Sequence, residues 1–285
     1  MIPAAFDYVR ATTVADAVSA LAAGGDDAKV LGGGQSLMPL LRTRLAAPSL
    51  LVDTSRVAEM QGIRDDGDAL VIGASTTHHT VLHDALVREH APLVAAATAT
   101  VADPAIRHRG TFGGSLAHAD PAGDLPAVAV ALGFTFEAAG PGGSRSIDAS
   151  DFFVDYFTSA LAADEVLVAV RVPKLGPGWG YDYQKFQRTA QSWAIVGVAA
   201  AVRRSNGSIA EARIGLTNMG ATPLRAAGAE AALAGAPATP DGVRAAAEHA
   251  AEGTHPNSDL NAKSDYREHL ARVLTRRAVL AAAGT

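Results

Sequence analysis

The first part of the chain combines one amphipathic segment with several short apolar runs. Within residues 12–24, apolar side chains recur three or four positions apart, at Val14, Ala17, Val18 and Leu21. Two threonines precede this pattern and a glycine ends it, which predicts a helix. Apolar runs at 29–31, 50–53 and 69–74 predict strands. The first two of these strands enclose a glycine turn, so the sequence predicts an early β-α-β unit.

Helical segments and strands continue to alternate through the middle of the chain. A helix is expected to begin within 76–83, a second spans 91–102 and is built almost wholly of small residues, and an apolar third covers 124–132. Strands are expected at 134–137 and 164–172, where apolar side chains predominate. This mixture predicts an α+β fold.

The pattern changes in the last third of the chain. Residues 181–186 alternate between polar and aromatic side chains, 194–202 are apolar, and the turn sequence at 205–208 leads into a return strand at 209–216. Such a turn between two apolar runs is typical of a hairpin. Three helices are expected to follow, at 222–233, 241–252 and 266–283. The prediction is a three-stranded antiparallel sheet backed by helices.

Glycine and proline cluster between two predicted strands at 174–178. Such breakers mark a linker, and a chain of 285 residues is long enough for two domains. We therefore expect one domain over residues 1–175 and a smaller second domain over residues 179–285.

Composition excludes several classes of function. The net charge is −5 and the sequence has no basic cluster, which argues against a nucleic-acid-binding face. The chain has no cysteine, so it cannot form disulfides, thiolate zinc sites or cysteine-bound iron–sulfur clusters. No apolar run is long enough for a membrane span. We expect a soluble cytoplasmic protein.

Two glycine-rich stretches carry the candidate chemistry. Residues 32–36 read Gly-Gly-Gly-Gln-Ser and residues 111–115 read Thr-Phe-Gly-Gly-Ser. Glycine can bring bare backbone amides against a ligand, so each stretch is a candidate anion-binding turn, and two such turns on one diphosphate would hold a dinucleotide. A side chain at Gly33 or Gly114 is expected to occupy the place of the phosphate.

Known nucleotide-binding templates do not match these stretches. Leu37 stands where the Rossmann fingerprint needs its third glycine, and no Gly-Lys-Ser/Thr of a Walker loop is present. Each stretch taken alone has the alternative interpretation of an ordinary glycine turn.

Together the two stretches resemble the FAD-binding medium subunit of molybdenum hydroxylases, with its PCMH-type FAD-binding domain. The first is followed by Leu-Met-Pro at 37–39, and the second leads into Ala-His-Ala-Asp-Pro at 117–121 and Asp-Leu-Pro at 124–126. Carbon monoxide dehydrogenase and bacterial xanthine dehydrogenases are similar from Phe6 to the C-terminal helix. The sequence departs from the family pattern at His108, Thr189 and 191–192, which leaves the electron acceptor and the subunit contacts open.

The resemblance implies non-covalently bound FAD and a set of contact residues. By this mapping the cofactor contacts are Leu31, Gly32, Gly33, Gly34, Gln35, Ser36, Leu37, Ile106, Thr111, Gly113, Gly114, Ser115, Ala117, Asp120, Asp124, Leu167, Lys185 and Trp193. No catalytic residue and no metal ligand is assigned on this chain.

Several of these residues have an alternative structural role. Asp124 either faces cofactor hydroxyls or caps a helix, and Leu167 either touches the flavin or is a core leucine. Lys185 either stabilises negative charge on the flavin or is a surface lysine. Trp193 either shields the ring or belongs to the core.

Other polar residues are weaker candidates. His79 and His83 are one helical turn apart, but they lack a third ligand, so we discard a metal site. Arg107 and Arg109 precede the second stretch and are candidates for phosphate contact, or else are solvated loop arginines.

The resemblance also implies a function. A molybdenum-binding large subunit hydroxylates the substrate, an iron–sulfur small subunit with [2Fe-2S] clusters passes electrons on, and the FAD of this chain delivers them to an acceptor. A dimer of such heterotrimers is one possible assembly. Two alternatives stay open on the sequence. One is a stand-alone flavin oxidoreductase with its own substrate, and the other is a non-catalytic nucleotide-binding module.

Overall fold

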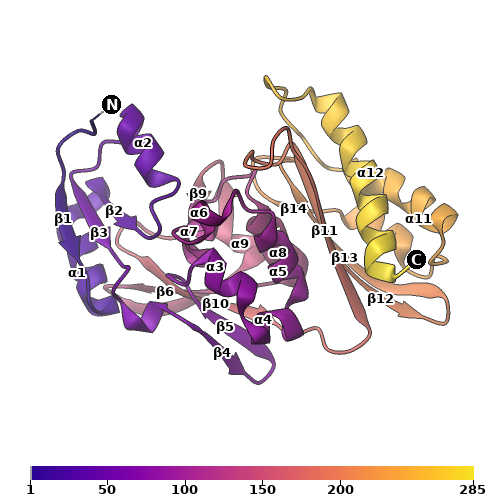
Figure 1. The fold of residues 1–285 in the computed structure, drawn as a ribbon, viewed down its shortest axis with the longest axis horizontal. Helices are drawn as coiled ribbons and strands as arrows, with labels where there is room; N and C mark the ends of the chain where they lie inside the picture. The colour runs from indigo at the N-terminus through magenta and orange to yellow at the C-terminus, as the bar shows by residue number, and fades with distance from the viewer. Residues whose placement is uncertain (1) are drawn as a thin grey trace.

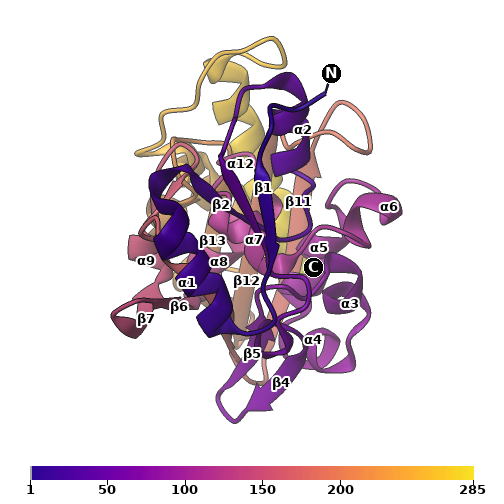
Figure 2. The same cartoon turned by 90° about the vertical axis from the view of Figure 1, so that its left-hand side faces the viewer.

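The protein consists of three α/β units that lie side by side, as the computed structural model of residues 2–285 shows (Figure 1). The first unit is a parallel sheet of order β1-β3-β2, formed by β1 (Asp7–Arg10), β2 (Ala28–Leu31) and β3 (Leu50–Asp53). Helix α1 (Val14–Gly24) and the short α2 (Leu37–Thr43) connect these strands. The end-on view places β1 and α1 nearest to the viewer (Figure 2). The predicted β-α-β unit is present.

The expected N-terminal helix begins where its capping residues place it. The Thr13 hydroxyl accepts a hydrogen bond from the Asp16 amide, and the Asp16 carboxylate accepts one from the Thr13 amide. This reciprocal pair satisfies two amides that the first helical turn leaves without partners. Leu21 and Ala17 are buried on the inner face.

The second unit is an antiparallel sheet of five strands in the order β4-β5-β10-β6-β7. Its strands are β4 (Ile63–Asp66), β5 (Ala69–Gly73), β6 (Thr135–Gly140), β7 (Gly143–Asp148) and β10 (Val166–Pro173). The helices of this unit are α3 (His78–His83), α4 (Ala85–His90), α5 (Pro92–Ala99), α6 (Pro104–Arg107), α7 (Phe112–Ala117), α8 (Asp124–Leu132) and α9 (Ala149–Phe152), and a small ribbon pairs β8 (Phe153–Asp155) with β9 (Thr158–Ser159). Phe136 stacks on Phe152 in its core.

The third unit is an antiparallel sheet of order β11-β12-β13-β14. The three predicted strands are β11 (Trp179–Phe186), β12 (Val196–Ser205) and β13 (Ser208–Thr217), and a two-residue β14 (Leu224–Arg225) extends the sheet. Its helices are α10 (Ala227–Leu233), α11 (Pro240–Ala247) and α12 (Ser264–Ala283). Asn206 and Gly207 both have positive φ, as the two-residue hairpin turn requires.

This third sheet is covered on both faces. Gly180 on β11 approaches the backbone of Ala282 on α12 so closely that a methyl group there would collide, and Gly215 on β13 approaches Ala127 on α8 in the same way. Helix α8 belongs to the second unit, so it is shared between the two sheets, and α5 also contacts β11. The second and third units are therefore closely packed.

Two local expectations differ from the structure. The helix expected at 222–233 begins only at Ala227, because the preceding residues pair with β13 as β14. The second glycine stretch, expected as a loop, forms the short helix α7 with Thr111 as its N-cap. The remaining short pieces are three 3₁₀ turns, η1 (Gly25–Asp27), η2 (Ala58–Met60) and η3 (Glu248–Ala251).

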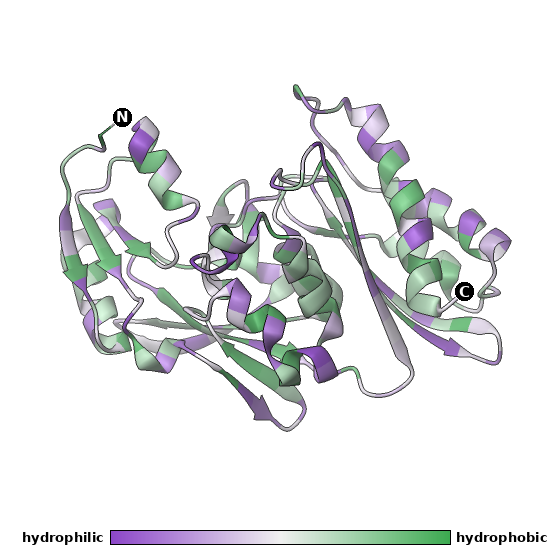
Figure 3. Ribbon diagram, viewed as in Figure 1, coloured by the Kyte–Doolittle hydropathy of each residue, from purple (hydrophilic) through white to green (hydrophobic). Residues whose placement is uncertain are grey.

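Strands β1, β4 and β7 had no sequence signal, and each of them lies at a sheet edge. Strands β1, β4 and β7 are almost wholly exposed, and β4 is visibly hydrophilic in the colouring of Figure 3. An edge strand of this kind buries little apolar surface, so its periodicity is weak. Among the helices within residues 2–285, none is long and apolar enough to cross a membrane.

Candidate functional site

The two glycine stretches meet in the folded chain. A methyl group built on Gly33 would lie 2.1 Å from the carbonyl oxygen of Arg109 and 2.6 Å from the Cα of Gly110, and one on Gly32 would lie 3.0 Å from the Thr111 hydroxyl. The backbone after β2 therefore rests directly on the backbone that leads into α7. This confirms that residues 32–36 and 111–115 converge.

The glycines serve this close packing rather than leaving space for a ligand. A side chain at Gly113 would collide with Ala74, and one at Gly114 would lie 2.6 Å from the Thr111 hydroxyl. The expectation that a side chain at Gly33 or Gly114 would occupy a phosphate's place is therefore wrong, because it would strike protein atoms first. Substitution at Gly33 acts by moving the two stretches apart, whereas substitution at Gly114 disturbs the N-cap contact of Thr111.

The first stretch offers a run of successive unpaired backbone donors. Within residues 2–285, no protein group accepts a hydrogen bond from the amides of residues 33–36, and Gly34 has a positive φ of 74° that turns this backbone. In the second stretch the Gly113 amide donates to the Ala74 carbonyl and the Gly114 amide to the Thr111 hydroxyl. A turn of successive free amides is a general anion-binding feature.

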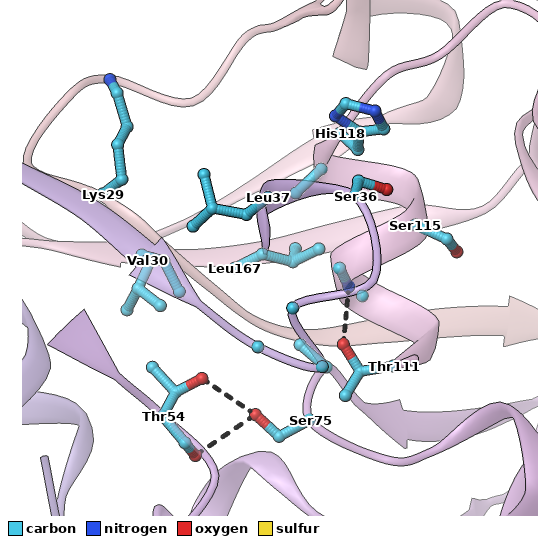
Figure 4. A pocket seen from close by; sticks show the side chains of 18 of the residues that line it. Lys29, Val30, Ser36, Leu37, Thr54, Ser75, Thr111, Ser115, His118 and Leu167 are labelled. Carbon is cyan, nitrogen blue, oxygen red and sulfur yellow. Dashed lines mark hydrogen bonds between the residues drawn. The ribbon is translucent and has the colours of Figure 1, made fainter. Parts of the chain in front are cut away.

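A cleft of about 390 Å³ opens beside the point where the stretches meet (Figure 4). Twelve of the predicted contact residues line it, from both stretches and from β10: Gly32, Gly33, Gly34, Gln35, Ser36, Leu37, Thr111, Gly113, Gly114, Ser115, Ala117 and Leu167. Leu167 is nevertheless 5% exposed, so it contributes to the core and to the wall of the cleft at once.

A second recess of about 540 Å³ lies beyond the same turn. It shares Gly33, Gly34 and Gln35 with the first cleft, and adds Met38, Pro39, Arg42, Thr43 and Arg109. The turn with the free amides thus separates two recesses. Arg107 does not reach either recess, since its guanidinium donates to the carbonyl of Val101 at 2.8 Å.

Asp124 and Lys185 lie close together, but outside both recesses. The Lys185 ammonium is 2.8 Å from the Asp124 carboxylate and donates to the carbonyl of Thr100 at 3.0 Å, and each side chain is only 4% exposed. The Tyr183 hydroxyl donates to the other Asp124 oxygen at 2.7 Å. The pair joins α8 to β11 across the two halves of the chain, so Lys185 is not a surface lysine. Asp124 is not a helix cap either, since Gly123 is the N-cap of α8.

Burial dominates the electrostatics of this pair. Removal from water raises the pKa of Asp124, while the charge of Lys185 and the Tyr183 hydroxyl act in the opposite direction. Burial and the adjacent carboxylate raise the pKa of Tyr183 well above its usual value. Tyr183 is therefore a neutral hydrogen-bond donor at pH 7.

The other predicted contact residues line neither recess. Leu31 ends β2, and the Ile106 carbonyl accepts from the Gly110 amide at 2.7 Å. The Asp120 carboxylate accepts from the Ala122 amide, and burial raises its pKa. Trp193 is 55% exposed in the loop after β11, so it is not a core residue.

Sequence reasoning missed six polar residues that line the cleft: Lys29, Thr54, Ser75, His78, His118 and Glu165. Thr54 and Ser75 follow the ends of β3 and β5, and their hydroxyls are 3.2 Å apart. In parallel α/β sheets, ligands bind beyond the carboxyl ends of the strands. This rule was a signal for Thr54 after β3, but not for Ser75, because β5 belongs to an antiparallel sheet.

Three histidines outside the cleft, His79, His83 and His108, contact one another. The His83 ring nitrogen Nδ1 lies 2.8 Å from the His79 carbonyl, and the His79 ring stacks on His108. No group of three metal-binding side chains occurs in the part of the chain that the structure describes.

Comparison with known proteins places this geometry in a family. Residues 4–175 match the family of the FAD binding domain in molybdopterin dehydrogenase, and residues 181–282 match the CO dehydrogenase flavoprotein C-terminal domain. The carbon monoxide dehydrogenase medium chain of Hydrogenophaga pseudoflava is 39% identical over 99% of this chain and 98% of its own length. The 6-hydroxypseudooxynicotine dehydrogenase complex subunit alpha of Paenarthrobacter nicotinovorans is 38% identical over 97% of this chain and 94% of its own length.

Solved structures agree with the sequence matches. Carbon monoxide dehydrogenase from Hydrogenophaga pseudoflava has a chain that superposes with a TM-score of 0.97 at 40% identity, covering 100% of this chain and 99% of that one. The chain is thus a flavoprotein subunit of an oxidoreductase complex with FAD as its cofactor, and in this family the molybdenum cofactor and the iron–sulfur clusters belong to other subunits. It belongs to the FAD-binding medium subunits of molybdenum hydroxylases of the carbon monoxide dehydrogenase and xanthine dehydrogenase type.

Proposed function

We propose that this subunit passes electrons from a partner iron–sulfur subunit through non-covalently bound FAD to an external acceptor. The observation that carries the proposal is the first glycine turn, whose free amides separate two recesses. FAD has its diphosphate in the middle and a ring system at each end, and a turn of this kind flanked by two recesses matches that shape.

The amides of residues 33–36 and the Thr111 hydroxyl are proposed to hold the diphosphate. A hydrogen bond to a charged partner contributes about 1.5–3 kcal/mol. Three or four such bonds approach the roughly 8 kcal/mol of micromolar binding, before the entropy cost of immobilising the ligand. Backbone donors from one turn, assisted by the second stretch that supports it, are therefore sufficient.

The two recesses suggest how the two ends of the cofactor are placed. In the C-terminal half, the Gln191 amide donates to the Asp103 carboxylate at 2.6 Å, which brings the loop with Trp193 toward α6 and the residues before Arg109. We therefore propose that the isoalloxazine ring lies in the recess lined by Met38, Arg42 and Arg109, near Ile106 and Trp193. The adenosine end then occupies the cleft lined by Leu167.

Asp124 and Lys185 are proposed to position the two halves of the site rather than to touch the ring. The Lys185 ammonium already has two protein acceptors and almost no exposure. A cation neutralised in this way has little charge left to offer a ligand. Its contribution is to hold β11, and with it the loop that carries Trp193, against α5 and α8.

The substrate is proposed to be set outside this chain. Relatives that match nearly its whole length are named as subunits of a carbon monoxide dehydrogenase, a nicotine 6-hydroxylase, a glyceraldehyde dehydrogenase and a caffeine dehydrogenase. A medium chain shared by enzymes of such different substrates fits an electron-transfer role. Bound FAD supplies the exchange of electrons in one- or two-electron steps.

Purification of the chain alone and with its partners tests the proposal. The isolated protein is expected to be yellow, to release FAD on acid denaturation, and to be reduced by substrate only when co-expressed with a molybdenum subunit and an iron–sulfur subunit. Substrate reduction of the isolated chain would support a stand-alone oxidoreductase, and a protein that stays colourless with added FAD would support a non-catalytic module. The mass of the co-expressed complex tests whether heterotrimers pair, and cell fractionation tests the expected cytoplasmic location.

A further inference from the structure

His78 is a buried polar residue of the cleft that the proposed FAD contacts do not use. It is the first residue of α3, it lines the cleft, and it is only 3% exposed. Its Nδ1 is buried without a hydrogen-bond partner among the described residues. Nε2 also has no hydrogen-bond partner among these residues but is not enclosed in this way, so it is the ring nitrogen that can meet a ligand in the cleft.

The backbone fixes the position of this ring relative to the glycine stretches. The His78 amide donates to the Gly110 carbonyl at 2.9 Å. A methyl group on Gly110 would lie 3.0 Å from Cδ2 and 3.4 Å from Nε2 of the imidazole. The Nε2 edge of the ring therefore packs against Gly110, on which Gly33 rests in turn.

The protonation state follows from the surroundings of the ring. Burial, and secondarily the positive charge of Arg107, lower the pKa of His78 to about 4. The imidazole is thus neutral at pH 7 and has one N–H donor. A proton on the enclosed Nδ1 would leave an unpaired N–H, whereas a proton on Nε2 places the donor on the edge that faces Gly110.

We infer that His78 is a further binding residue of this cleft, donating a hydrogen bond from Nε2 to an oxygen of the diphosphate of the bound dinucleotide. The inference rests on the proposed FAD site. It adds a side-chain donor, held by the second glycine stretch, to the backbone donors of the first. The ring and the free amides of residues 33–36 then approach the diphosphate from the two segments that meet there.

FAD titration of the cofactor-stripped full-length protein tests this inference. His78→Leu keeps the approximate volume and removes the donor, and His78→Gln keeps a donor near the position of Nε2. His79→Leu is the matched control, because His79 is adjacent and does not line the cleft. We expect His78→Leu to raise the Kd for FAD by roughly 10- to 150-fold, and His78→Gln and His79→Leu to stay within about threefold of wild type.

Two further measurements separate a binding role from a packing role. The cofactor-free His78→Leu protein should melt no lower than wild type, because it loses an unsatisfied polar group. The Ki of ADP, which shares the diphosphate, should rise in His78→Leu by about the same factor as the Kd for FAD, whereas the Ki of riboflavin should keep its wild-type value.

Equal affinity of wild type and His78→Leu for FAD would overturn the inference and leave the proposed function intact. Equal losses in His78→Leu and His78→Gln would also overturn it, because the donor and not the volume is claimed. A wild-type protein that does not bind FAD would overturn the proposed function and the inference together.

Discussion

A single methyl group at Gly33 is expected to abolish FAD retention by separating the two glycine stretches. In the structure this methyl would lie 2.1 Å from the Arg109 carbonyl oxygen, whereas ordinary contact begins at 3.4 Å. One of the two backbones must therefore move by more than an ångström. Both are main chain, so no side-chain rotation relieves the overlap.

The magnitude follows from the bonds that such a shift removes. Displacing the turn misaligns two or more of the amides of residues 33–36, each contributing about 1.5–3 kcal/mol to binding of a charged group. The Kd for FAD is then expected to rise by at least 100-fold, since each 1.4 kcal/mol corresponds to about tenfold. Overpacking adds a stability loss of about 1–3 kcal/mol.

The assay is the FAD content of purified Gly33→Ala protein, from the ratio of flavin to protein absorbance, together with its melting temperature and circular dichroism. Gly142→Ala is the matched control, because a methyl group there meets nothing within 4 Å and the residue has no positive φ. Wild-type FAD content and melting temperature in Gly33→Ala would refute the reasoning.

Three other changes test different parts of the structure. Lys185→Met should lower the free energy of unfolding, measured by chemical denaturation, by about 3–5 kcal/mol because it leaves the buried Asp124 carboxylate unpaired. Adding Asp124→Leu to Lys185→Met should recover most of that loss. A double variant as unstable as the single one would argue against the pairing. Although burial alone would raise the pKa of Asp259, two backbone amides and Arg267 hold it at about 2, below the ordinary value of 3.8. The ionised Asp259 carboxylate therefore stabilises the fold above pH 3.8, and this contribution is lost toward pH 2. The difference in melting temperature between wild type and Asp259→Asn should shrink as the pH falls over that range. A constant difference would contradict this. Trp193→Ala should change the unfolding free energy by less than about 0.5 kcal/mol, because the side chain is exposed. The same variant should raise the fluorescence of bound FAD, because it removes the aromatic side chain proposed to lie near the flavin. Unchanged emission would place Trp193 away from the ring.

Much of the candidate site was predictable from local sequence. The free amides of residues 33–36 follow from consecutive glycines after an apolar strand, which is a backbone property that needs no tertiary information. The contacts from the second half of the chain were less predictable. Lys185 and Asp124 are 61 positions apart, and only the packing of α5 and α8 against the third sheet shows that they neutralise each other.

The sequence by itself determined the elements whose apolar period is strong, such as helix α8 and strand β3, whose bounds it predicted without error. It also determined the first glycine turn, because glycine acts through its own backbone, whereas the second stretch forms helix α7. Tertiary structure alone decided that Gly33 rests on Arg109, that His78 is enclosed beside Gly110, and that the exposed strands β1, β4 and β7 join sheets at all. These features depend on contacts between distant segments, whose energies come from packing and burial in the assembled fold and leave no periodic trace along the chain.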